Sequence, residues 1–101
     1  MNDVYDKTNR QLYSTEHSRK PVNFYYAAPH AKSVQLAGDF NHWHPVPMHQ
    51  REDGWWFIQA LLTHGHHQYH FLVNGQPILD PQALGTARDS NNQLVSLIAV
   101  S

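Results

Sequence analysis

From Pro21 onward the sequence is a series of short runs in which apolar and polar residues alternate, and this alternation constrains the fold more than any other feature. A period of two places every second side chain on the same face of a β-strand. Each run ends near glycine, proline, asparagine or aspartate, the residues that favour turns. Short strands separated by such turns predict an all-β sandwich or barrel.

The expected strands cover residues 22–27, 33–37, 55–62, 66–73, 76–79 and 93–100. Asn74-Gly75 is the strongest two-residue hairpin signal in the chain and joins the fourth of these strands to the fifth. Pro77 has no backbone N–H to donate, so it predicts an edge or strand-end position for residues 76–79. The segment 41–48, which contains two prolines, is expected to be a loop. The alternation predicts a core that includes Phe24, Val34, Leu36, Phe40, Trp56, Ile58, Tyr69, Phe71 and Val73.

Length and composition set the domain organisation. A chain of 101 residues has the usual size of one domain and can bury an apolar core without disulfides. Residues 1–20 are polar and show no sustained period, which predicts a flexible N-terminal arm ahead of a folded domain at 21–101. The sequence has no cysteine, which excludes a disulfide scaffold and a thiolate metal site.

Charge and hydropathy exclude two classes of partner. The formal net charge is −1 and the basic residues are scattered, so a nucleic-acid partner is not expected. The longest apolar run, near residues 94–100, is far shorter than the roughly 20 residues that cross a bilayer. Residues 1–20 contain no apolar signal core either, so we expect a cytoplasmic protein that does not enter a membrane.

Trp43 is the first candidate binding residue. It follows the strand end at Gly38-Asp39 and lies in a loop beside Asn41 and His42, outside any alternating run. An indole presented there can stack on the face of a ligand ring while its polar neighbours bind the polar groups of that ligand. The alternative is that Trp43 folds back over the core.

Five motifs follow one another in a recognisable order: residues 34–43, Gly54-Trp55-Trp56, Gly65, residues 69–75 and Asp80-Pro81. Over roughly residues 21–100 this order resembles the glycogen-binding, or isoamylase N-terminal, family, whose modules occur in the β subunit of AMP-activated kinase and ahead of branching and debranching enzymes. The resemblance implies an immunoglobulin-like, early-set β-sandwich of about seven strands. It implies non-catalytic binding of α-1,4-glucan, as glycogen, starch or maltooligosaccharide, without a cofactor. A glycogen-metabolising enzyme or a kinase is the implied protein partner.

The resemblance also assigns residues to the site. Trp43 matches the family's first stacking tryptophan, and His70 takes the place of a lysine that hydrogen-bonds sugar hydroxyls. A neutral histidine can donate and accept such bonds, although His70 could equally be a solvated strand residue. Pro77 stands where the family has a second stacking tryptophan, so one of two aromatic platforms is missing.

The segment Leu84-Gly85-Thr86 repeats the Leu-Gly-Thr of the kinase-type binding loop. The resemblance implies that Leu84 enters the bend of the glucan, and that Thr86 and a following asparagine, Asn91 or Asn92, bond to it. Either asparagine could instead be a turn residue before the last strand.

The two adjacent tryptophans differ in phase. Trp56 shares a face with Ile58, which favours the core, whereas Trp55 lies on the other face with Phe57. Trp55 could be a surface or interface residue, or it could replace the missing platform.

The nine histidines raise the alternative of a metal site. On one strand His66 and His70 would lie about 13 Å apart at roughly 3.3 Å per residue, too far to share a zinc ion. His64 and His66 lie closer, but no cysteine or neighbouring carboxylate completes a ligand set. We therefore expect no metal.

An enzyme is a further alternative, since glycoside hydrolysis needs two carboxylates in different environments. The candidate carboxylates all fall at expected turns, where solvation keeps them ionised: Asp39, Glu52, Asp53, Asp80 and Asp89. We therefore expect no catalytic residue. A sandwich that binds a glycogen enzyme without binding sugar remains the main alternative function.

Overall fold

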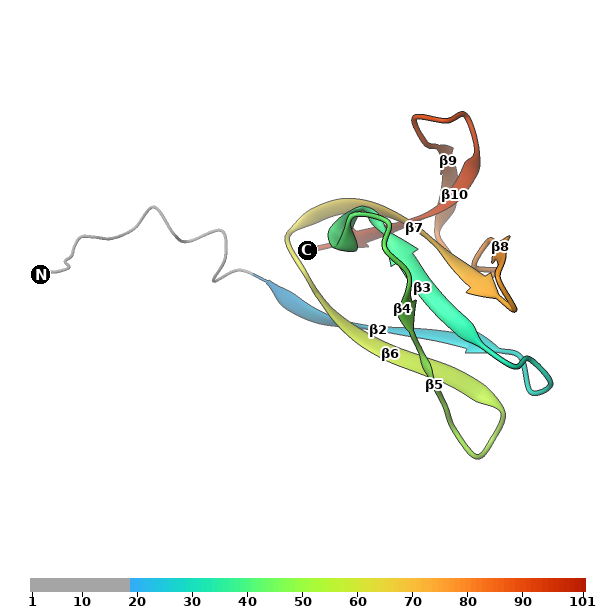
Figure 1. Cartoon of the computed structure of the whole chain (residues 1–101). Coiled ribbons are helices and arrows are strands. Elements are labelled where there is room, and N and C mark those ends of the chain that lie inside the picture. Colours follow the sequence, from blue (N-terminus) through green and yellow to red (C-terminus); the bar gives the residue numbers. More distant parts are fainter. Residues whose placement is uncertain (1–18) are drawn as a thin grey trace, which may run out of the picture.

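The computed structural model describes residues 19–101, so the arm expected at 1–20 lies almost wholly outside the described residues. Two antiparallel sheets pack face to face (Figure 1), which confirms the predicted all-β sandwich. The smaller sheet has the order β2-β6-β5, and the larger has the order β4-β3-β7-β10-β9 with β8 also paired to β7. The strands are β2 (Lys20–Ala27), β3 (Val34–Gly38), β4 (Val46–Pro47), β5 (His49–Gln50), β6 (Trp55–Leu62), β7 (Gly65–Val73), β8 (Gln76–Ile78), β9 (Gly85–Arg88) and β10 (Leu94–Val100).

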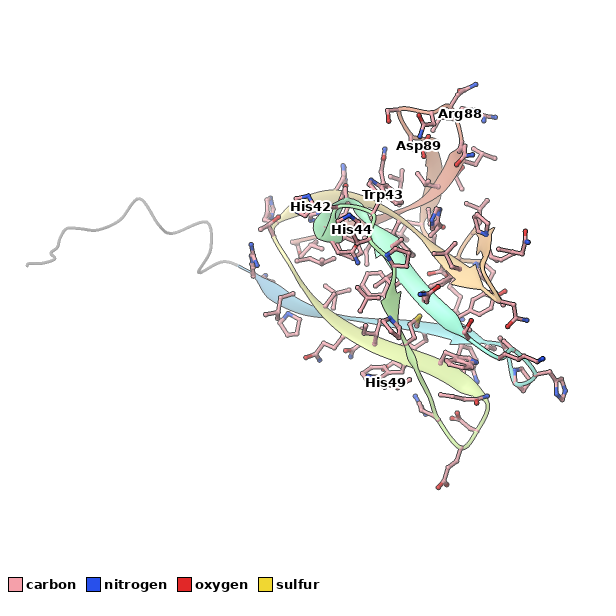
Figure 2. The ribbon with its side chains drawn as sticks, viewed as in Figure 1. His42, Trp43, His44, His49, Arg88 and Asp89 are labelled. Carbon is pink, nitrogen blue, oxygen red and sulfur yellow. The ribbon has the colours of Figure 1, made fainter. Side chains whose placement is uncertain are left out.

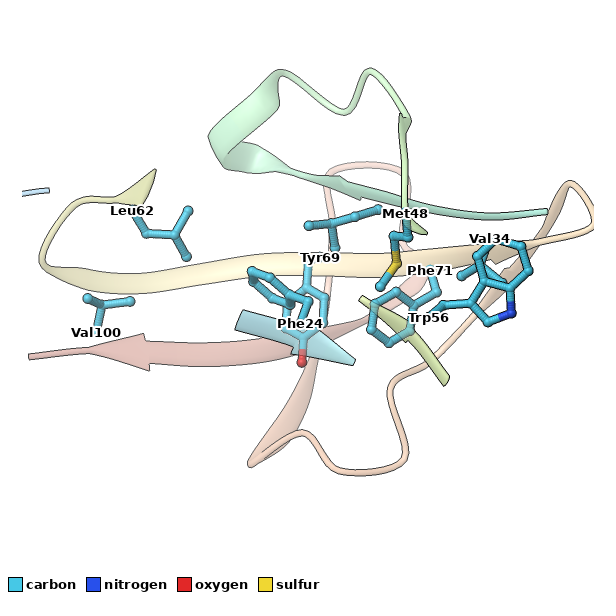
Figure 3. Close-up of a cluster of buried hydrophobic side chains, with 9 residues drawn as sticks. Phe24, Val34, Met48, Trp56, Leu62, Tyr69, Phe71 and Val100 are labelled. Carbon is cyan, nitrogen blue, oxygen red and sulfur yellow. The ribbon is translucent and has the colours of Figure 1, made fainter. Parts of the chain in front are cut away.

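The core lies between the two sheets (Figure 3) and rests on aromatic contacts that cross from one sheet to the other. Phe24 of β2 meets Tyr69 of β7 with ring centroids 5.0 Å apart, and Tyr26 meets Phe71 at 5.1 Å. Phe71 is completely buried. The buried cluster is Phe24, Val34, Leu36, Met48, Trp56, Leu62, Tyr69, Phe71 and Val100. The other predicted core residues, Phe40, Ile58 and Val73, are partly buried and pack against it.

Strand register fixes which side chains face inward. Opposed residues of an antiparallel pair share a face. Leu36 pairs with Phe71 and Ser96 with Tyr69, so these side chains face the core. Ala37 pairs with His70, which places both on the outer face of the larger sheet.

Three short strands differ from the sequence prediction. Residues 41–48 were expected to form only a loop, but β4 lies within them; β5 and β9 were not expected at all. Two-residue strands such as β4 and β5 exist because a longer neighbour, β3 or β6, supplies the partner groups. Pro47 is tolerated because β4 ends the strand order of the larger sheet.

The hairpin predicted at Asn74-Gly75 is present, and both residues have positive φ, as a tight β-hairpin turn requires. The amide oxygen of Asn74 also accepts hydrogen bonds from the backbone N–H groups of Lys32 and Ser33. Pro77 follows in β8. Among the described strands β8 pairs only with β7, so the predicted edge position is correct. Within residues 19–101 no helix has the length and apolarity to cross a bilayer.

Candidate functional site

A short irregular segment carries Trp43 out of the sandwich. The 3₁₀ turn η1 (Asp39–Asn41) follows β3, and the side chain of Asn41 accepts a hydrogen bond from the Gly38 N–H at 2.9 Å. His42 and Trp43 then both adopt the left-handed conformation, with φ of 57° and 60°. Non-glycine residues seldom take this conformation, and consecutive ones re-aim the chain sharply. The Trp43 N–H bonds the Gly38 carbonyl at 2.8 Å, which ties the loop to the end of β3.

The Trp43 indole lies against the outer face of the larger sheet. Its ring centroid is 5.3 Å from that of His70, and the two planes meet at 61°. Ala37, which pairs with His70, and Leu72, which pairs with Pro77, continue the same face. Trp43 therefore forms a wall above a floor of strand residues and does not fold back into the core cluster.

The tip of the β9–β10 hairpin forms the opposite wall. The carboxylate of Asp89 accepts hydrogen bonds from the backbone N–H groups of Asn91 and Gln93, each at 2.9 Å, and so orders the turn. Figure 2 shows Trp43 and Asp89 on the same side of the molecule, well away from His49 on the other sheet. Between the walls is a groove of about 420 Å³, within the usual size range of ligand sites. Its lining is Ala37, Trp43, His70, Leu72, Pro77, Asp89, Ser90, Asn91 and Gln93.

The imidazole of His70 is uncharged at neutral pH. Its partial burial lowers the pKa of His70 below the ordinary 6.5, and the nearby Asp89 carboxylate only partly opposes this shift. A neutral imidazole has one N–H donor and one nitrogen acceptor, so it can bond both ways with a hydroxyl group. The groove thus combines an aromatic wall with hydroxyl-compatible groups, and no lysine or arginine among residues 19–101 lines it.

Residues 20–101 match the family described as the glycogen recognition site of AMP-activated protein kinase. The chain belongs to this family. It is 43% identical over 80 residues to the 5'-AMP-activated protein kinase subunit beta-1 of Sus scrofa, covering 78% of this chain and 57% of that subunit. It is 32% identical over 83 residues to the 1,4-alpha-glucan branching enzyme GlgB of Chlamydia muridarum, covering 76% of this chain and 11% of the enzyme.

A solved maltogenic amylase from S. marinus shares the fold, with a TM-score of 0.70 at 21% identity over 82% of this chain and 14% of that one. The resemblance drawn from the sequence motifs is confirmed. The family is one of carbohydrate recognition and not of catalysis. The chain spans little more than half of the pig subunit.

In this glycogen recognition domain, three of the predicted site residues lie in the groove, together with the proline that replaces the second stacking tryptophan. Trp43, His70 and Asn91 line it, and so does Pro77. Asn92 does not line it; its φ is 64° and its carbonyl accepts a bond from Arg88, so it is a turn residue.

Leu84 and Thr86 lie elsewhere. Leu84 is 85% exposed and borders two different hollows, one against β10 and one beside Tyr25. Thr86 pairs with Ser96, which in turn pairs with Tyr69, so the register directs Thr86 to the face opposite His70. The structure does not bring these two residues to the Trp43 groove.

Four further residues line the groove without having been predicted from the sequence: Ala37, Leu72, Ser90 and Gln93. Asp89, predicted only as a turn carboxylate, lines it too. Alternation did place Leu72 on the same face as His70, so that residue had a usable signal. The hairpin residues Ser90 and Gln93 had no such signal in the sequence. They reach the groove through the pairing of β9 with β10, and β9 was not predicted.

His67 of the histidine-rich segment and the turn carboxylates Asp39 and Asp80 have structural partners. One ring nitrogen of His67 lies 2.9 Å from the Asp39 carboxylate and the other 2.9 Å from the Thr63 carbonyl. Asp80 accepts the Tyr69 hydroxyl at 2.6 Å and the Gln82 N–H at 2.9 Å. Across residues 19–101 no three His, Cys, Asp or Glu side chains are grouped as metal ligands.

Proposed function

We propose that the chain binds α-1,4-glucan in the groove between Trp43 and the β9–β10 hairpin, and that it does not hydrolyse the polymer. The observation that carries the proposal is the Trp43 indole held at the rim of a groove floored by His70, in a domain of the glycogen recognition family. The exposed face of the indole stacks on the C–H face of a glucose unit.

Hydrogen bonds then select the sugar. Neutral His70 donates and accepts at the floor, while the Asn91 and Gln93 amides and the Ser90 hydroxyl offer both donors and acceptors from the hairpin. This matches the hydroxyl groups of a neutral sugar, each of which is both donor and acceptor. One carboxylate oxygen of Asp89 already accepts both hairpin N–H groups, so Asp89 holds that wall in place.

Pro77 limits the affinity. It lies in the groove lining where a second stacking ring would lie, and its small ring has no π face. The loss of an anchor of about 2 kcal/mol corresponds to about thirtyfold in affinity. We infer that single sites are weak and that a polymer with many neighbouring chains is retained by avidity.

The wider role is part of the proposal. Since the named relatives are a kinase subunit and a branching enzyme, we infer that this domain targets or regulates a glycogen-metabolising partner in the cytoplasm. Leu84 and Thr86 remain predicted glucan contacts, and a chain seated on Trp43 would have to extend beyond the groove to reach them.

The test is sedimentation of the protein with glycogen, and with cellulose as the negative polymer, for wild type and Trp43→Ala. We expect the substitution to abolish most of the retention while circular dichroism shows an intact fold. Leu61→Ala is the matched control, because Leu61 is an exposed apolar residue of the other sheet. Unchanged retention of Trp43→Ala would place the site elsewhere. A wild-type protein that does not sediment with glycogen would favour the protein-interaction alternative.

A further inference from the structure

The outer face of the smaller sheet carries a second group of aromatic side chains. Tyr25 pairs with Phe57 across β2 and β6, and their ring centroids are 5.3 Å apart at 40°. Trp55 lies two residues from Phe57 and therefore on the same face. The neighbours Phe24 and Trp56 are buried in the core, so the three rings point away from it.

A hollow of about 270 Å³ lies beside these rings, lined by Tyr25, Arg51, Asp53, Trp55 and Gln82. The turn between β5 and β6 holds its charged groups in place. The Asp53 carboxylate accepts the Trp55 N–H at 3.0 Å and pairs with the Arg51 guanidinium at 2.9 Å. That guanidinium in turn lies 5.8 Å from the centre of the Tyr25 ring.

Gln82 reaches this hollow from the loop between β8 and β9. Its N–H bonds the Asp80 carboxylate at 2.9 Å, and the Asp80 N–H bonds the buried Ser96 hydroxyl at 2.8 Å. Tyr25 and Gln82 also line an adjoining hollow of about 220 Å³ that ends at Leu84. A continuous surface thus runs from Trp55 past Tyr25 and Gln82 to Leu84.

We propose that this surface, which we call the Trp55 hollow, is a second α-glucan site. The Trp55 and Tyr25 rings stack on glucose units, and Arg51, Asp53 and Gln82 bond their hydroxyl groups. The choice of ligand class rests on the proposed function of the Trp43 groove. Like that groove, the hollow combines aromatic rings with planar hydrogen-bonding side chains.

A neutral sugar fits this surface better than a protein partner does. The Arg51–Asp53 pair carries no net charge, and both side chains can bond hydroxyl groups while their ion pair stays intact. A stable protein interface needs about 800 Å² per partner around a dry apolar centre. Here the rings are interrupted by an ion pair whose side chains are 50% and 48% exposed.

The two sites lie on opposite faces of the sandwich. The Trp43 groove is on the outer face of the larger sheet, whereas the Trp55 hollow is on the smaller one. One short oligosaccharide therefore cannot fill both, but two chains of a branched polymer can. Avidity between two weak sites would let a domain with Pro77 in place of an aromatic platform hold glycogen.

The three tryptophans allow each site to be followed separately in the full chain. Maltoheptaose is titrated into ¹⁵N-labelled protein while the indole N–H signals are recorded. Trp43 reports the groove, Trp55 reports the hollow, and Trp56 is the internal control because its indole N–H bonds the Ala28 carbonyl at 2.8 Å. We expect the Trp43 and Trp55 signals to shift and the Trp56 signal to stay.

Two variants separate this proposal from the proposed function. In Trp43→Ala the Trp55 signal should still titrate with maltoheptaose. In Gln82→Ala the apparent dissociation constant of maltoheptaose, measured from the Trp55 signal, should rise about fivefold, which corresponds to the loss of one hydrogen bond.

A Trp55 signal that does not shift in wild type while the Trp43 signal saturates would overturn the second site and leave the groove intact. A static Trp43 signal with a moving Trp55 would overturn the groove alone. A Trp55 signal that shifts when the protein concentration is raised without sugar would show that this face binds a second copy of the chain instead.

Discussion

The Trp43 indole meets the His70 imidazole at a steep angle, with ring centroids 5.3 Å apart. The loop after β3 and the middle of β7 supply the two rings, so the contact exists only when those strands pair. His70 therefore has two functions in the proposed groove: it supports the indole, and it bonds the sugar.

We expect His70→Ala to weaken glucan retention by at least about fivefold, because one lost hydrogen bond of about 1 kcal/mol gives fivefold by itself and the support of the indole is lost as well. His70→Gln should restore most of the binding, since the neutral glutamine amide also donates to and accepts from hydroxyl groups. Affinity electrophoresis in glycogen gels measures both. Equal mobility of wild type and His70→Ala would remove His70 from the site.

The lowered pKa of His70 predicts a pH dependence of binding. Above that pKa the imidazole is neutral and able to accept a bond, and below it the ring is charged and must be desolvated by the incoming sugar. Retention should therefore be constant near pH 7 and fall as the pH drops below 6.5 through the folded-state pKa. His70→Gln should remove this fall. An unaltered pH profile in His70→Gln would assign the titration to another group.

Stability should follow the same titration. The unfolded chain takes up a proton on His70 near the ordinary pKa of 6.5, whereas the folded chain does so only at lower pH. Between these two values the unfolded state binds more protons, so the free energy of unfolding rises with pH in that window. Urea unfolding at several pH values measures the slope. The slope should be smaller in His70→Gln than in wild type. The other histidines are present in both proteins, so their contribution cancels in the difference.

The Tyr69 hydroxyl is a structural group. It is 2% exposed and donates to Asp80 at 2.6 Å, and burial together with that carboxylate raises the pKa of Tyr69, so the hydroxyl stays protonated. Tyr69→Phe should cost about 1–3 kcal/mol of unfolding free energy, because Asp80 loses a partner. The matched control Tyr25→Phe, at the surface, should change stability by less than about 0.5 kcal/mol. Similar losses in both variants would contradict the assignment.

Pro77 provides a gain-of-function test. It lies at the groove on β8 opposite Leu72, where a larger side chain meets solvent. Pro77→Trp should add a stacking platform and tighten maltoheptaose binding about five- to thirtyfold, for about 1–2 kcal/mol. Gln76→Trp is the control, since Gln76 pairs with Val73 and its side chain alternates to the other face. Calorimetry that finds no gain, or an equal gain in the control, would show that the bound glucan does not reach Pro77.

The long strands were predictable because their signal is local. Residues 55–62 form a nearly continuous apolar run bounded by turn residues, so the predicted strand and β6 coincide, and Asn74-Gly75 specifies its own turn. The short strands β4, β5 and β9 were not predictable, since two to four residues show no period of their own. They form because a longer strand beside them offers unpaired backbone groups.

The sequence by itself determined the family, the sandwich and the position of Trp43 on a loop, because motif order, alternation and turn residues are properties of neighbouring positions. Only the tertiary structure decided what surrounds that tryptophan. Pairing of β3 with β7 sets His70 beneath it, and pairing of β9 with β10 brings Asn91 to the groove. The same register turns Thr86 to the opposite face and leaves Leu84 beside Tyr25. A one-residue change in register reverses the face of every side chain, and register depends on contacts between strands that are distant in the sequence.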